Sequence, residues 1–512
     1  MSRVSGWITL AILGLAGTAS TACAASPQAD GGTEGMAQLP ETPTGRRVAA
    51  LVTALNTGDP SAIETFVERS YRPDVGGAPK AKYWTAVQRE LGPLSFRAAE
   101  EDAMSHAGHV FWYRGTVTGA WVGLDLELEA DNPYRIVANG VRRGIRPSVV
   151  PDGPAVPRAE LPDSIEAFLT ASAGADHFSG VVIVAQGDDV VFEGAFGMAD
   201  RQDGVPNTLD TPFRLASATK MFTGVAIAQL VERGKLSFDD LISRIIPEYP
   251  EHIGRQVTVR HLLTHTSGIE LDDDPEFNAA ITRARSVEEL LEVQLRYIER
   301  LNSGNYQNFA PLESFDYTNE GIDLLGVVIE RASGQTWSDY VRSNVLGPAG
   351  MKRTGTDFLT PIPDLAKSYS LRGTEPGQWV PERRLVAQGE RGAAWIRPAG
   401  TGYATAPDML RFFRALSEGK LLGPDLANTI TSPQIQLRVP SGLEFKRSYG
   451  FGFRIEDTRK SVRVVGHTGG GPGMSTVVQI YPELDITVIV LANYDRAASW
   501  VNQHIQELLG IL

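Results

Sequence analysis

The stretch Ser217-Ala-Thr-Lys-Met-Phe-Thr-Gly-Val-Ala-Ile-Ala-Gln-Leu-Val231 joins a candidate nucleophile to a buried helix. From Met221 to Val231 apolar residues occupy nearly every side, which is typical of a helix enclosed in a core. Gly234 is well placed to end this helix in a left-handed conformation. We therefore expect Ser217 at the first turn, with Lys220 three positions on and on the same face.

A lysine at the start of a buried helix is costly unless it is paired or neutral. Desolvation and the positive helix terminus both favour the neutral amine, which could take the proton of a Ser217 hydroxyl attacking a carbonyl. The alternative is a surface helix start with an N-cap serine and a solvated lysine. Ser417-Glu-Gly-Lys420 also fits S-x-x-K, but it lies where a helix runs into a glycine turn that would not bury Lys420. Ser217 is the better candidate.

A second signal, Tyr317-Thr-Asn319, lies directly before an apolar run at 321–330 that predicts a helix. Asn319 is expected to cap that helix, and the Tyr317 hydroxyl, on a loop, can point into a cleft. Tyr306-Gln-Asn308 has the same spacing but lies in a polar stretch with no apolar helix behind it. The alternative for Tyr317 is an ordinary half-buried tyrosine.

A third signal, His467-Thr-Gly-Gly-Gly-Pro-Gly473, joins two strand-like runs at 461–465 and 475–481. Glycine lets another chain or a ligand approach the backbone, and free N–H groups there could bind a substrate or an oxyanion. The alternative is a glycine-rich hairpin turn with an incidental histidine. His265, in a second His-Thr pair, shows that such a pair alone proves little.

The three signals together resemble the motif set of the serine β-lactamase and penicillin-binding protein superfamily: S-x-x-K, S/Y-x-N and K-T-G. The tyrosine version resembles the class C branch, which includes class C β-lactamases, D-alanyl-D-alanine carboxypeptidases, D-aminopeptidases and β-lactamase-like esterases. The similarity runs from about residue 161 to the C-terminus. Further stretches share it, at 213–220, 261–268, 398–405, 449–453 and 466–469.

By position, the resemblance implies that Ser217 is the acylated nucleophile and that Lys220 and Tyr317 share the general-base role. Asn319 would bind the substrate amide, and the backbone N–H groups of Ser217 and Gly470 would form the oxyanion hole. The remaining substrate-binding positions would be His467, Thr468 and Gly469.

His467 departs from the lysine of class C β-lactamases, and the His-x-Gly form resembles some DD-carboxypeptidases and D-aminopeptidases. A histidine with a pKa of about 6.5 is mostly neutral at pH 7, which weakens capture of a carboxylate and support for a Tyr317 phenolate. We therefore expect a serine hydrolase that acts through an acyl-enzyme on an amide, peptide or ester. The alternatives are a class C-like β-lactamase, or a penicillin-binding sensor with slow deacylation.

The composition of the 512 residues bounds the partners of the chain. A formal net charge of −13 argues against nucleic acid, whose binding requires clustered positive charge. The eight histidines are scattered and no thiol lies beyond the signal region, so we expect no metal and no cofactor. The expected partner is a small-molecule or peptide substrate, with a cell-wall fragment as one candidate.

The N-terminus predicts export to the periplasm or the extracellular space. Met1-Ser-Arg3 precedes an apolar segment, Trp7 to Leu15, that is too short to span a membrane, and Ala22-Cys-Ala24 offers a small-residue cleavage site. Cys23 could instead be lipidated, but Ser20 stands where a lipoprotein signal usually has a bulky aliphatic residue. The lipid anchor is therefore the less favoured route. No other segment is long and apolar enough to cross a bilayer.

Composition divides the chain into five parts: a signal peptide (1–24), a flexible tether (25–44), a small α+β domain (45–147), a linker (148–160) and the hydrolase domain (161–512). The α+β domain starts with helices, and its order resembles the ketosteroid-isomerase-like cone fold. Leu124 and Leu126 lie in an alternating run from Val122 to Glu129 that predicts a strand with one wet face. This domain is expected to serve packing, substrate presentation or protein contact.

For residues 161–512 the resemblance implies an α/β fold of the β-lactamase/transpeptidase type, an antiparallel sheet flanked by helices with a helical subdomain. The residues agree: a hairpin is predicted around Gly187-Asp-Asp189, and strands recur only near the end, with a final helix at 499–509. Such a sheet joins both ends of the domain. The cleft between sheet and helical insert is where Ser217 and His467 could meet.

Overall fold

The computed structural model describes residues 39–511 apart from 103–104, 106–107, 133, 144–146, 148, 151–152, 270, 272–274, 302–309, 357–361, 375–376, 387–396, 401 and 439–445. The predicted signal peptide with Cys23, residues 25–38 of the predicted tether, and Tyr306 lie outside these residues. Among the described residues no helix has both the length and the apolar character needed to cross a membrane.

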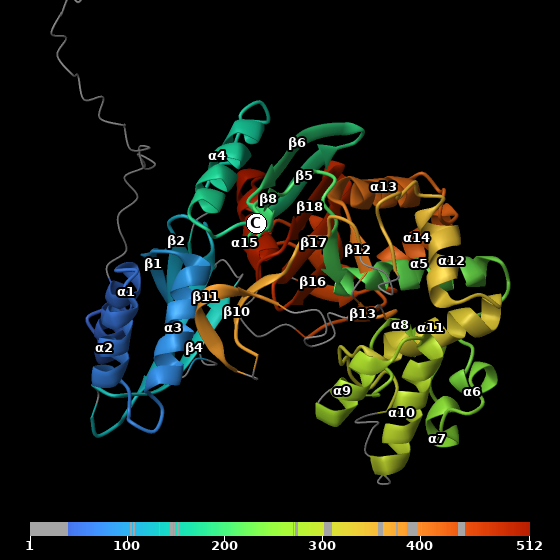
Figure 1. Cartoon of the computed structure of the whole chain (residues 1–512), viewed down its shortest axis with the longest axis horizontal. Coiled ribbons are helices and arrows are strands. Elements are labelled where there is room, and N and C mark those ends of the chain that lie inside the picture. The colour runs from blue at the N-terminus through green and yellow to red at the C-terminus, as the bar shows by residue number, and fades with distance from the viewer. Residues whose placement is uncertain are drawn as a thin grey trace, which may run out of the picture. The chain divides into compact units, whose positions relative to one another are not determined.

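The first elements form an α+β segment, residues 43–143, drawn in blue to cyan in Figure 1. Its helices are α1 (Pro43–Asn56), α2 (Pro60–Ser70) and α3 (Ala78–Leu91), and its strands are β1 (Leu94–Glu101), β2 (His109–Gly115), β3 (Trp121–Leu128) and β4 (Ile136–Arg143). The strands pair antiparallel in the order β1-β2-β3-β4. This order agrees with the predicted α+β pattern, although α1 begins inside the stretch assigned to the tether.

One prediction for β3 is wrong in part. Leu124 and Leu126 are buried as expected, but Asp125 on the opposite face is only 3% exposed. Trp112 of the paired strand lies over Gly123, where an added Cβ would come 2.8 Å from its ring. The second face of β3 is therefore covered at Gly123 and Asp125 and exposed at Glu127, because a bulky neighbour fills the space above the glycine.

A large antiparallel sheet joins strands from both ends of the remaining chain, as predicted, in the order β13-β14-β15-β16-β17-β18-β5-β6. The link is the pairing of β18 with β5, in which Ile489 lies opposite Ile183. The strands are β5 (Gly180–Gln186), β6 (Asp189–Phe196), β13 (Ile435–Gln436), β14 (Lys446–Tyr449), β15 (Arg454–Asp457), β16 (Arg463–Gly471), β17 (Met474–Tyr481) and β18 (Ile486–Ala492).

The helices of this part cover both faces of the large sheet. They are α4 (Leu161–Gly174), α5 (Lys220–Glu232), α6 (Ile242–Ile245), α7 (Glu251–Gly254), α8 (Val259–Leu263), α9 (Pro275–Arg283), α10 (Val287–Leu301), α11 (Glu320–Ser333), α12 (Trp337–Val341), α13 (Ala406–Ser417), α14 (Pro424–Thr431) and α15 (Ala497–Leu508). A π-helical turn, Arg342–Leu346, follows α12.

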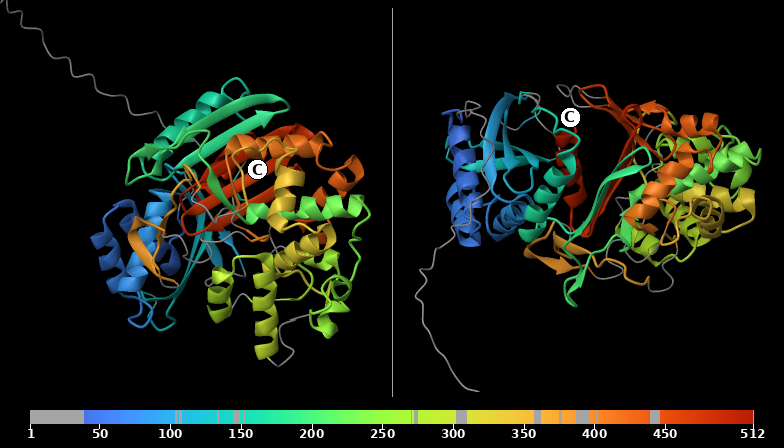
Figure 2. Two further views of the ribbon diagram at one scale, coloured as in Figure 1. Left: turned by 45° about the vertical axis from the view of Figure 1, so that its right-hand side comes forward. Right: turned by 90° about the horizontal axis from the view of Figure 1, so that it is seen from above.

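Alternate residues of β5 belong to two different cores, because side chains point to opposite faces of a strand. Val181 and Ile183 pack in a core with α5 and the other helices of the insert. Val182 and Val184 pack in a second core that includes α4, α15 and the α+β segment. Figure 2 (right) shows these layers in succession, with α4 and α15 between the two sheets. The α+β segment thus shares a continuous core with the rear face of the large sheet.

Short strands also occur between β6 and β13, where the sequence predicts mostly helix and loop. They are β7 (Met198–Asp200), β8 (Val205–Pro206), β9 (Phe213–Ala216), β10 (Tyr369–Arg372), β11 (Trp379–Leu385) and β12 (Gly402–Ala404). β12 pairs with β9, directly before Ser217. The β10–β11 hairpin reaches the α+β segment, where Trp379 lies edge-on to Tyr83 with ring centroids 5.5 Å apart.

Candidate active site

Ser217 stands on a tight turn between β9 and α5. Residues 217–219 form a short 3-10 turn, and Ala216 before it has φ +46° and ψ −132°, a sparsely populated conformation for a residue with a Cβ. Thr219 fixes the turn, since its Oγ1 donates to Ala216 O at 2.8 Å and accepts from Gly402 N at 2.9 Å. The half-buried Ser217 is thereby held at the start of the helix, as predicted.

Lys220 is fully buried and is surrounded by acceptors. Its Nζ donates to Ser217 Oγ at 3.3 Å, to Asn319 Oδ1 at 2.8 Å and to Ala399 O at 2.6 Å. Three acceptors match the three N–H groups of an ammonium ion. The structure therefore brings Ser217, Lys220 and Asn319 together, and this geometry suits a charged lysine that orients the nucleophile.

Asn319 does not cap its helix, contrary to expectation. It occupies the N-cap position of α11, but its side chain makes no capping hydrogen bond. Its Oδ1 instead accepts from Lys220. A buried cation is a stronger partner for an amide oxygen than a backbone N–H that water can reach. The Asn319 side chain therefore accepts from Lys220 instead of capping α11.

Tyr317 lies against Lys220, with Nζ 4.8 Å from the ring centroid. The residue is half-buried, and its hydroxyl oxygen is shielded from solvent. Burial acts to raise the pKa of Tyr317, but the charges of Lys220 and Arg454, with hydrogen bonding to Ser217 and Lys220, outweigh it and lower the pKa. Because Oη has no hydrogen bond of ordinary geometry within the described residues, we attribute the shift to the two charges.

Arg454 is the nearby cation that sequence reasoning missed. It begins β15 and its guanidinium carbon lies 5.2 Å from the centroid of the Tyr317 ring. His467 is expected to weaken support for a Tyr317 phenolate, because it lacks the fixed charge of a lysine. Arg454 places another fixed charge beside Tyr317 from a neighbouring strand. Nothing in the spacing of the sequence relates Arg454 to the three motifs.

His467 is buried and both of its ring nitrogens have protein partners. Nδ1 lies 2.6 Å from Thr468 O and Nε2 lies 2.9 Å from Tyr449 Oη. Since a carbonyl can only accept, Nδ1 carries the proton and Nε2 accepts from the tyrosine. Burial, followed by the charges of Arg454 and Lys220, lowers the pKa of His467 well below its usual value. His467 is thus a neutral residue at neutral pH.

His265 also lies beside the site, although its motif was set aside as uninformative. Its ring stacks on Tyr317 with centroids 4.4 Å apart, and its Nδ1 accepts from Thr318 N at 3.3 Å. Its backbone has φ +55°, and its carbonyl accepts from Asp316 N at 2.9 Å. Burial, with the charges of Lys220 and Arg454, lowers its pKa well below the usual value. His265 therefore supports the loop that carries Tyr317.

Most of the glycine-rich stretch belongs to strand β16, which runs to Gly471, and only Pro472 and Gly473 form the turn to β17. β16 passes alongside the turn that bears Ser217. Thr468 lies on this strand beside Gly469, and the backbone at Gly470 is exposed. A Cβ on Gly469 would come 2.0 Å from Leu215 O of β9. Glycine at this position therefore lets the two strands approach.

Replacing Gly469 with alanine should force β16 away from β9. We expect a loss of about 1–3 kcal/mol in unfolding free energy and slower acylation of Ser217, measured by thermal melting and probe labelling. Gly470→Ala is the matched control, because a Cβ there meets nothing within 4 Å and the N–H is retained. Equal effects of the two substitutions would contradict this explanation.

Ser417, the second serine that fits S-x-x-K, does not form a catalytic site. Ser417 ends α13, where its Oγ donates to Arg414 O at 2.9 Å. Lys420 is exposed and pairs with Glu418. The preference for Ser217 over Ser417 therefore has a structural basis. Tyr306, which has the same spacing to an asparagine as Tyr317, lies outside the described residues.

Comparison with known proteins identifies the class. The chain belongs to the β-lactamase family, since the family model described as Beta-lactamase matches residues 165–508. It is 30% identical over 348 residues to penicillin-binding protein 4* of Bacillus subtilis, an alignment that spans 66% of this chain and 74% of that protein. It is accordingly a serine hydrolase of the β-lactamase-related family.

Solved structures confirm the predicted fold. A penicillin-binding protein from Bacillus halodurans is similar with a TM-score of 0.54 and 28% identity, over 69% of this chain and 98% of that one. A D-stereospecific amidohydrolase from Streptomyces sp. is similar with a TM-score of 0.53 and 26% identity, over 70% of this chain and 100% of that one. The antiparallel sheet with flanking helices is therefore of the β-lactamase/transpeptidase type.

Proposed function

We propose that this hydrolase cleaves an amide, peptide or ester bond through an acyl-enzyme on Ser217, as a DD-peptidase, D-aminopeptidase or esterase does. The observation that carries the proposal is the meeting of two distant stretches, 217–220 and 317–319, at Lys220. Its Nζ lies 3.3 Å from Ser217 Oγ and 2.8 Å from Asn319 Oδ1, with the Tyr317 ring 4.8 Å away. A nucleophile, a cation and a phenol in one place are the parts that acyl transfer requires.

In the proposed first step Tyr317, as phenolate, takes the proton of Ser217 while Oγ bonds to the substrate carbonyl carbon. The carbonyl electron pair moves to oxygen, where the backbone N–H groups of Ser217 and Gly470 stabilise the negative charge. As the carbon–nitrogen or carbon–oxygen bond breaks, the leaving group takes the proton from Tyr317. Water then repeats the sequence on the acyl-enzyme and releases Ser217. The charges of Lys220 and Arg454 lower the pKa of Tyr317 and so favour the phenolate.

The residues around this centre fit a substrate with a carboxylate on the leaving group. Arg454 is exposed beside Tyr317, the group that protonates the leaving group. A guanidinium there can bind a carboxylate through two hydrogen bonds. His467 acts through Tyr449 and Thr468 rather than as a cation. The penicillin-binding and D-stereospecific amidohydrolase relatives support a D-configured amide or peptide, with a cell-wall peptide as one source.

Export to the periplasm or the extracellular space forms part of the proposal. Its support is the basic start, short apolar segment and small-residue site within residues 1–24. The mass of the mature chain from each cell fraction tests it: cleavage near Ala24 supports export, and a diacylated Cys23 would establish the lipid anchor instead.

A substrate panel with intact-mass detection tests the reaction. The panel contains D-Ala-D-Ala peptides, D-amino acid amides, short-chain esters, a penicillin and a chromogenic cephalosporin. The proposal expects turnover of a peptide, amide or ester with at most a transient adduct. Rapid cephalosporin turnover would establish the class C-like β-lactamase, and a stable penicillin adduct without peptide turnover would establish the sensor. No adduct and no turnover with any member would reject acyl transfer.

Arg454 should set the pH range in which Tyr317 acts as a base. Activity rises with pH as Tyr317 loses its proton, and the Arg454 charge lowers the pKa of Tyr317. Arg454→Gln should therefore move the ascending limb of the kcat/KM profile to higher pH, and Arg454→Lys should move it less. A neutral ester without a carboxylate serves as substrate, so that substrate binding is not altered. An unmoved limb in Arg454→Gln would exclude this role.

A further inference from the structure

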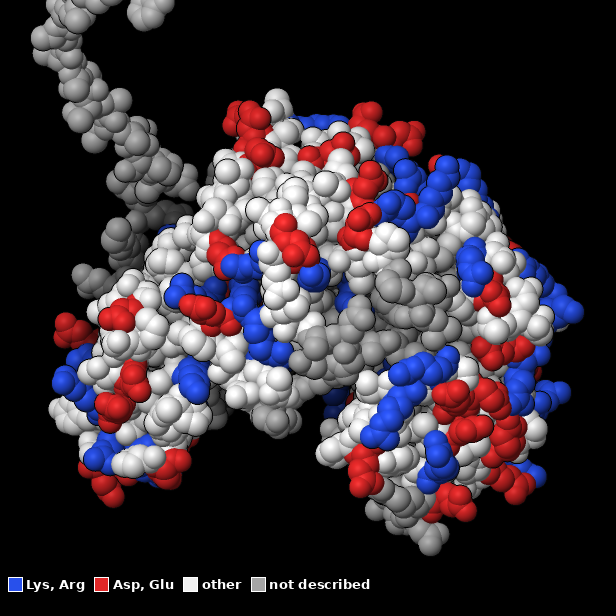
Figure 3. All heavy atoms as spheres, in the orientation of Figure 1, with Lys and Arg blue, Asp and Glu red and all other residues white. Residues whose placement is uncertain are grey.

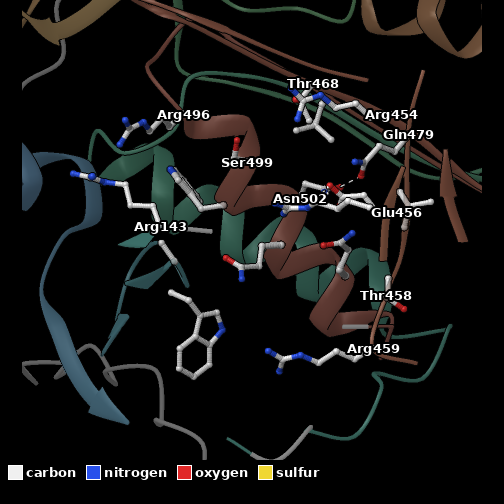
Figure 4. Close-up of a pocket in the computed structure, with 18 of the residues that line it drawn as sticks. Arg143, Arg454, Glu456, Thr458, Arg459, Thr468, Gln479, Arg496, Ser499 and Asn502 are labelled. Carbon is white, nitrogen blue, oxygen red and sulfur yellow. Dashed lines mark hydrogen bonds and ion pairs between the residues drawn. The ribbon is translucent and has the colours of Figure 1, made fainter. Parts of the chain in front are cut away.

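A cavity of about 570 Å³ lies behind strand β16, between the large sheet, α15 and the α+β segment. Trp121 and Arg143 of the α+β segment form one wall, Gln503 of α15 lies on another, and Thr468 and Arg454 stand at the sheet. In Figure 4, Arg143 and Arg496 lie on one side and Arg454 and Thr468 on the other, with Asn502 between them. The volume is in the range of small-ligand sites, and the wall is incomplete without the α+β segment.

Arg454 connects this cavity to the reaction centre. It lines the cavity, and its guanidinium carbon is 5.2 Å from the Tyr317 ring. The base that takes a proton from the nucleophile returns it to the leaving group, so the leaving group must lie on the Tyr317 side. Arg454 is shared by the reaction centre and the cavity, so a leaving group bound by Arg454 lies at the edge of the cavity. Substrate atoms that enter the cavity from there belong to the leaving group rather than to the acyl group.

Positive charge gathers in this cavity, although the chain as a whole has a net charge of −13. Acidic side chains gather over α6, α7 and α10 on the face drawn in Figure 3. The described residues that line the cavity include arginines from both parts of the chain, namely Arg143, Arg447, Arg454, Arg459 and Arg496. Such clustering in a hollow attracts an anion.

The carboxylates among the described lining residues are already held by arginines. Glu90 is 4% exposed, and its Oε1 lies 3.4 Å from Arg143 Nε and 3.5 Å from Arg496 Nη1. Glu456 pairs with Arg447 at 3.0 Å. Asp457 pairs at 3.0 Å with Arg463, which does not line the cavity. The arginines of the cavity are therefore in excess over its carboxylates.

Two buried groups at the cavity lack the hydrogen bonds that such groups usually make. Gln503 is 5% exposed, and its Oε1 has no partner within the described part of the chain. Arg143 Nη2 is likewise without a hydrogen-bond partner among the residues described. The unpaired Nη2 of Arg143 can donate to a carboxylate, while the unpaired Oε1 of Gln503 can accept from an N–H of the same ligand.

We propose that this cavity binds a second carboxylate, carried by the side chain of the leaving residue of a peptide substrate. The proposal rests on the proposed function, since it places the leaving group beside Tyr317. It assigns the α+β segment a part in substrate selection. Arg454 would take the terminal carboxylate of the leaving residue and Arg143 the carboxylate of its side chain, with Gln503 Oε1 accepting from an N–H of the substrate.

The test compares two peptides that share one acyl part ending in D-alanine and differ in the leaving residue, D-alanine or D-glutamate. We expect kcat/KM to favour the D-glutamate peptide by about tenfold, the usual worth of a charge-assisted hydrogen bond. Arg143→Gln should remove most of this preference and leave kcat/KM for the D-alanine peptide unchanged. Gln503→Glu is nearly isosteric and should also remove the preference, because its carboxylate would repel the side-chain carboxylate of D-glutamate. This second variant keeps the test valid should Arg143→Gln fail to fold.

Arg97→Gln is the matched control, because Arg97 is an exposed arginine of the same segment that does not line the cavity. It should retain the preference. An equal kcat/KM for the two peptides in the unmodified enzyme, or an unchanged preference in both cavity variants, would overturn the proposal.

Binding to the inactive Ser217→Ala protein separates this proposal from the reaction itself. If neither peptide is turned over, the proposed function fails, and calorimetric Kd values still decide the cavity. Tighter binding of the D-glutamate peptide that is lost when Arg143→Gln is added supports the site. Equal Kd values for the two peptides overturn it.

Discussion

Replacing Ser217 with alanine should abolish covalent labelling by a penicillin or phosphonate probe and lower kcat by about 10⁴-fold or more, as loss of a catalytic nucleophile does in other serine hydrolases. The fold should persist, because Ser217 is half-buried and its Oγ accepts one hydrogen bond, from Lys220. Labelling followed by mass spectrometry of the digested protein measures the effect, and circular dichroism checks the fold.

Ser417→Ala is the control, since Ser417 has the same motif spacing but a lysine that is exposed and paired with Glu418. This variant should label and turn over substrate like the unmodified enzyme. An adduct that persists in Ser217→Ala, or that maps to Ser417, would show that the nucleophile has been misassigned.

The local parts of the site could be predicted from the sequence because each is carried by a short segment. Ser217 and Lys220 share one turn, and Tyr317 and Asn319 share one loop before a helix. The strand carrying His467 was visible from its flanking runs. The resemblance then ordered these segments, and in the structure the Tyr317 loop meets Lys220 while the His467 strand lies beside the Ser217 turn.

The contacts that tune the site could not be predicted, because they depend on register between strands and on loops far apart in sequence. Arg454 lies opposite Gly466 in the β15–β16 pairing, but its own strand, Arg454–Asp457, shows only ordinary alternation. The Tyr449–His467 hydrogen bond depends on the same sheet. A pattern of residue types contains no information on such pairings.

Errors of the sequence predictions have a common physical origin, a tertiary contact that outweighs a local preference. Asn319 favours a helix cap, but the buried ammonium of Lys220 takes its oxygen. Asp125 alternates as a solvent-facing residue would, but Trp112 covers that face of the strand. The division into an α+β domain and a hydrolase domain stays a prediction, while the two parts share a buried apolar core with α15. Beside that core, Trp121 and Arg114 both contact Glu507.

The charges around Ser217 act differently on its two possible bases, Lys220 and Tyr317. Lys220 has three acceptors around Nζ, as an ammonium requires, while Tyr317 lies between Lys220 and Arg454 with a lowered pKa. His265 and His467, which also flank Tyr317, are held neutral by burial. Tyr317 is therefore the group whose anionic form the site stabilises, and it should be the base.

Replacing Tyr317 with phenylalanine should accordingly lower kcat by about 10²–10⁴-fold, the usual contribution of a general base. KM should change little, and the ascending limb of the pH profile assigned to Tyr317 should disappear. The ring would keep its stacking on His265, so stability should be retained. Steady-state kinetics across pH measure all three effects.

Tyr449→Phe is the control for loss of a buried hydroxyl at the same site. It removes the donor to His467 Nε2 but not a group that contacts the nucleophile. We expect it to retain the ascending limb with a smaller loss in kcat. Should Tyr317→Phe keep that limb at an unchanged pH, Lys220 rather than Tyr317 would be the base, and Tyr317 would serve only to position it.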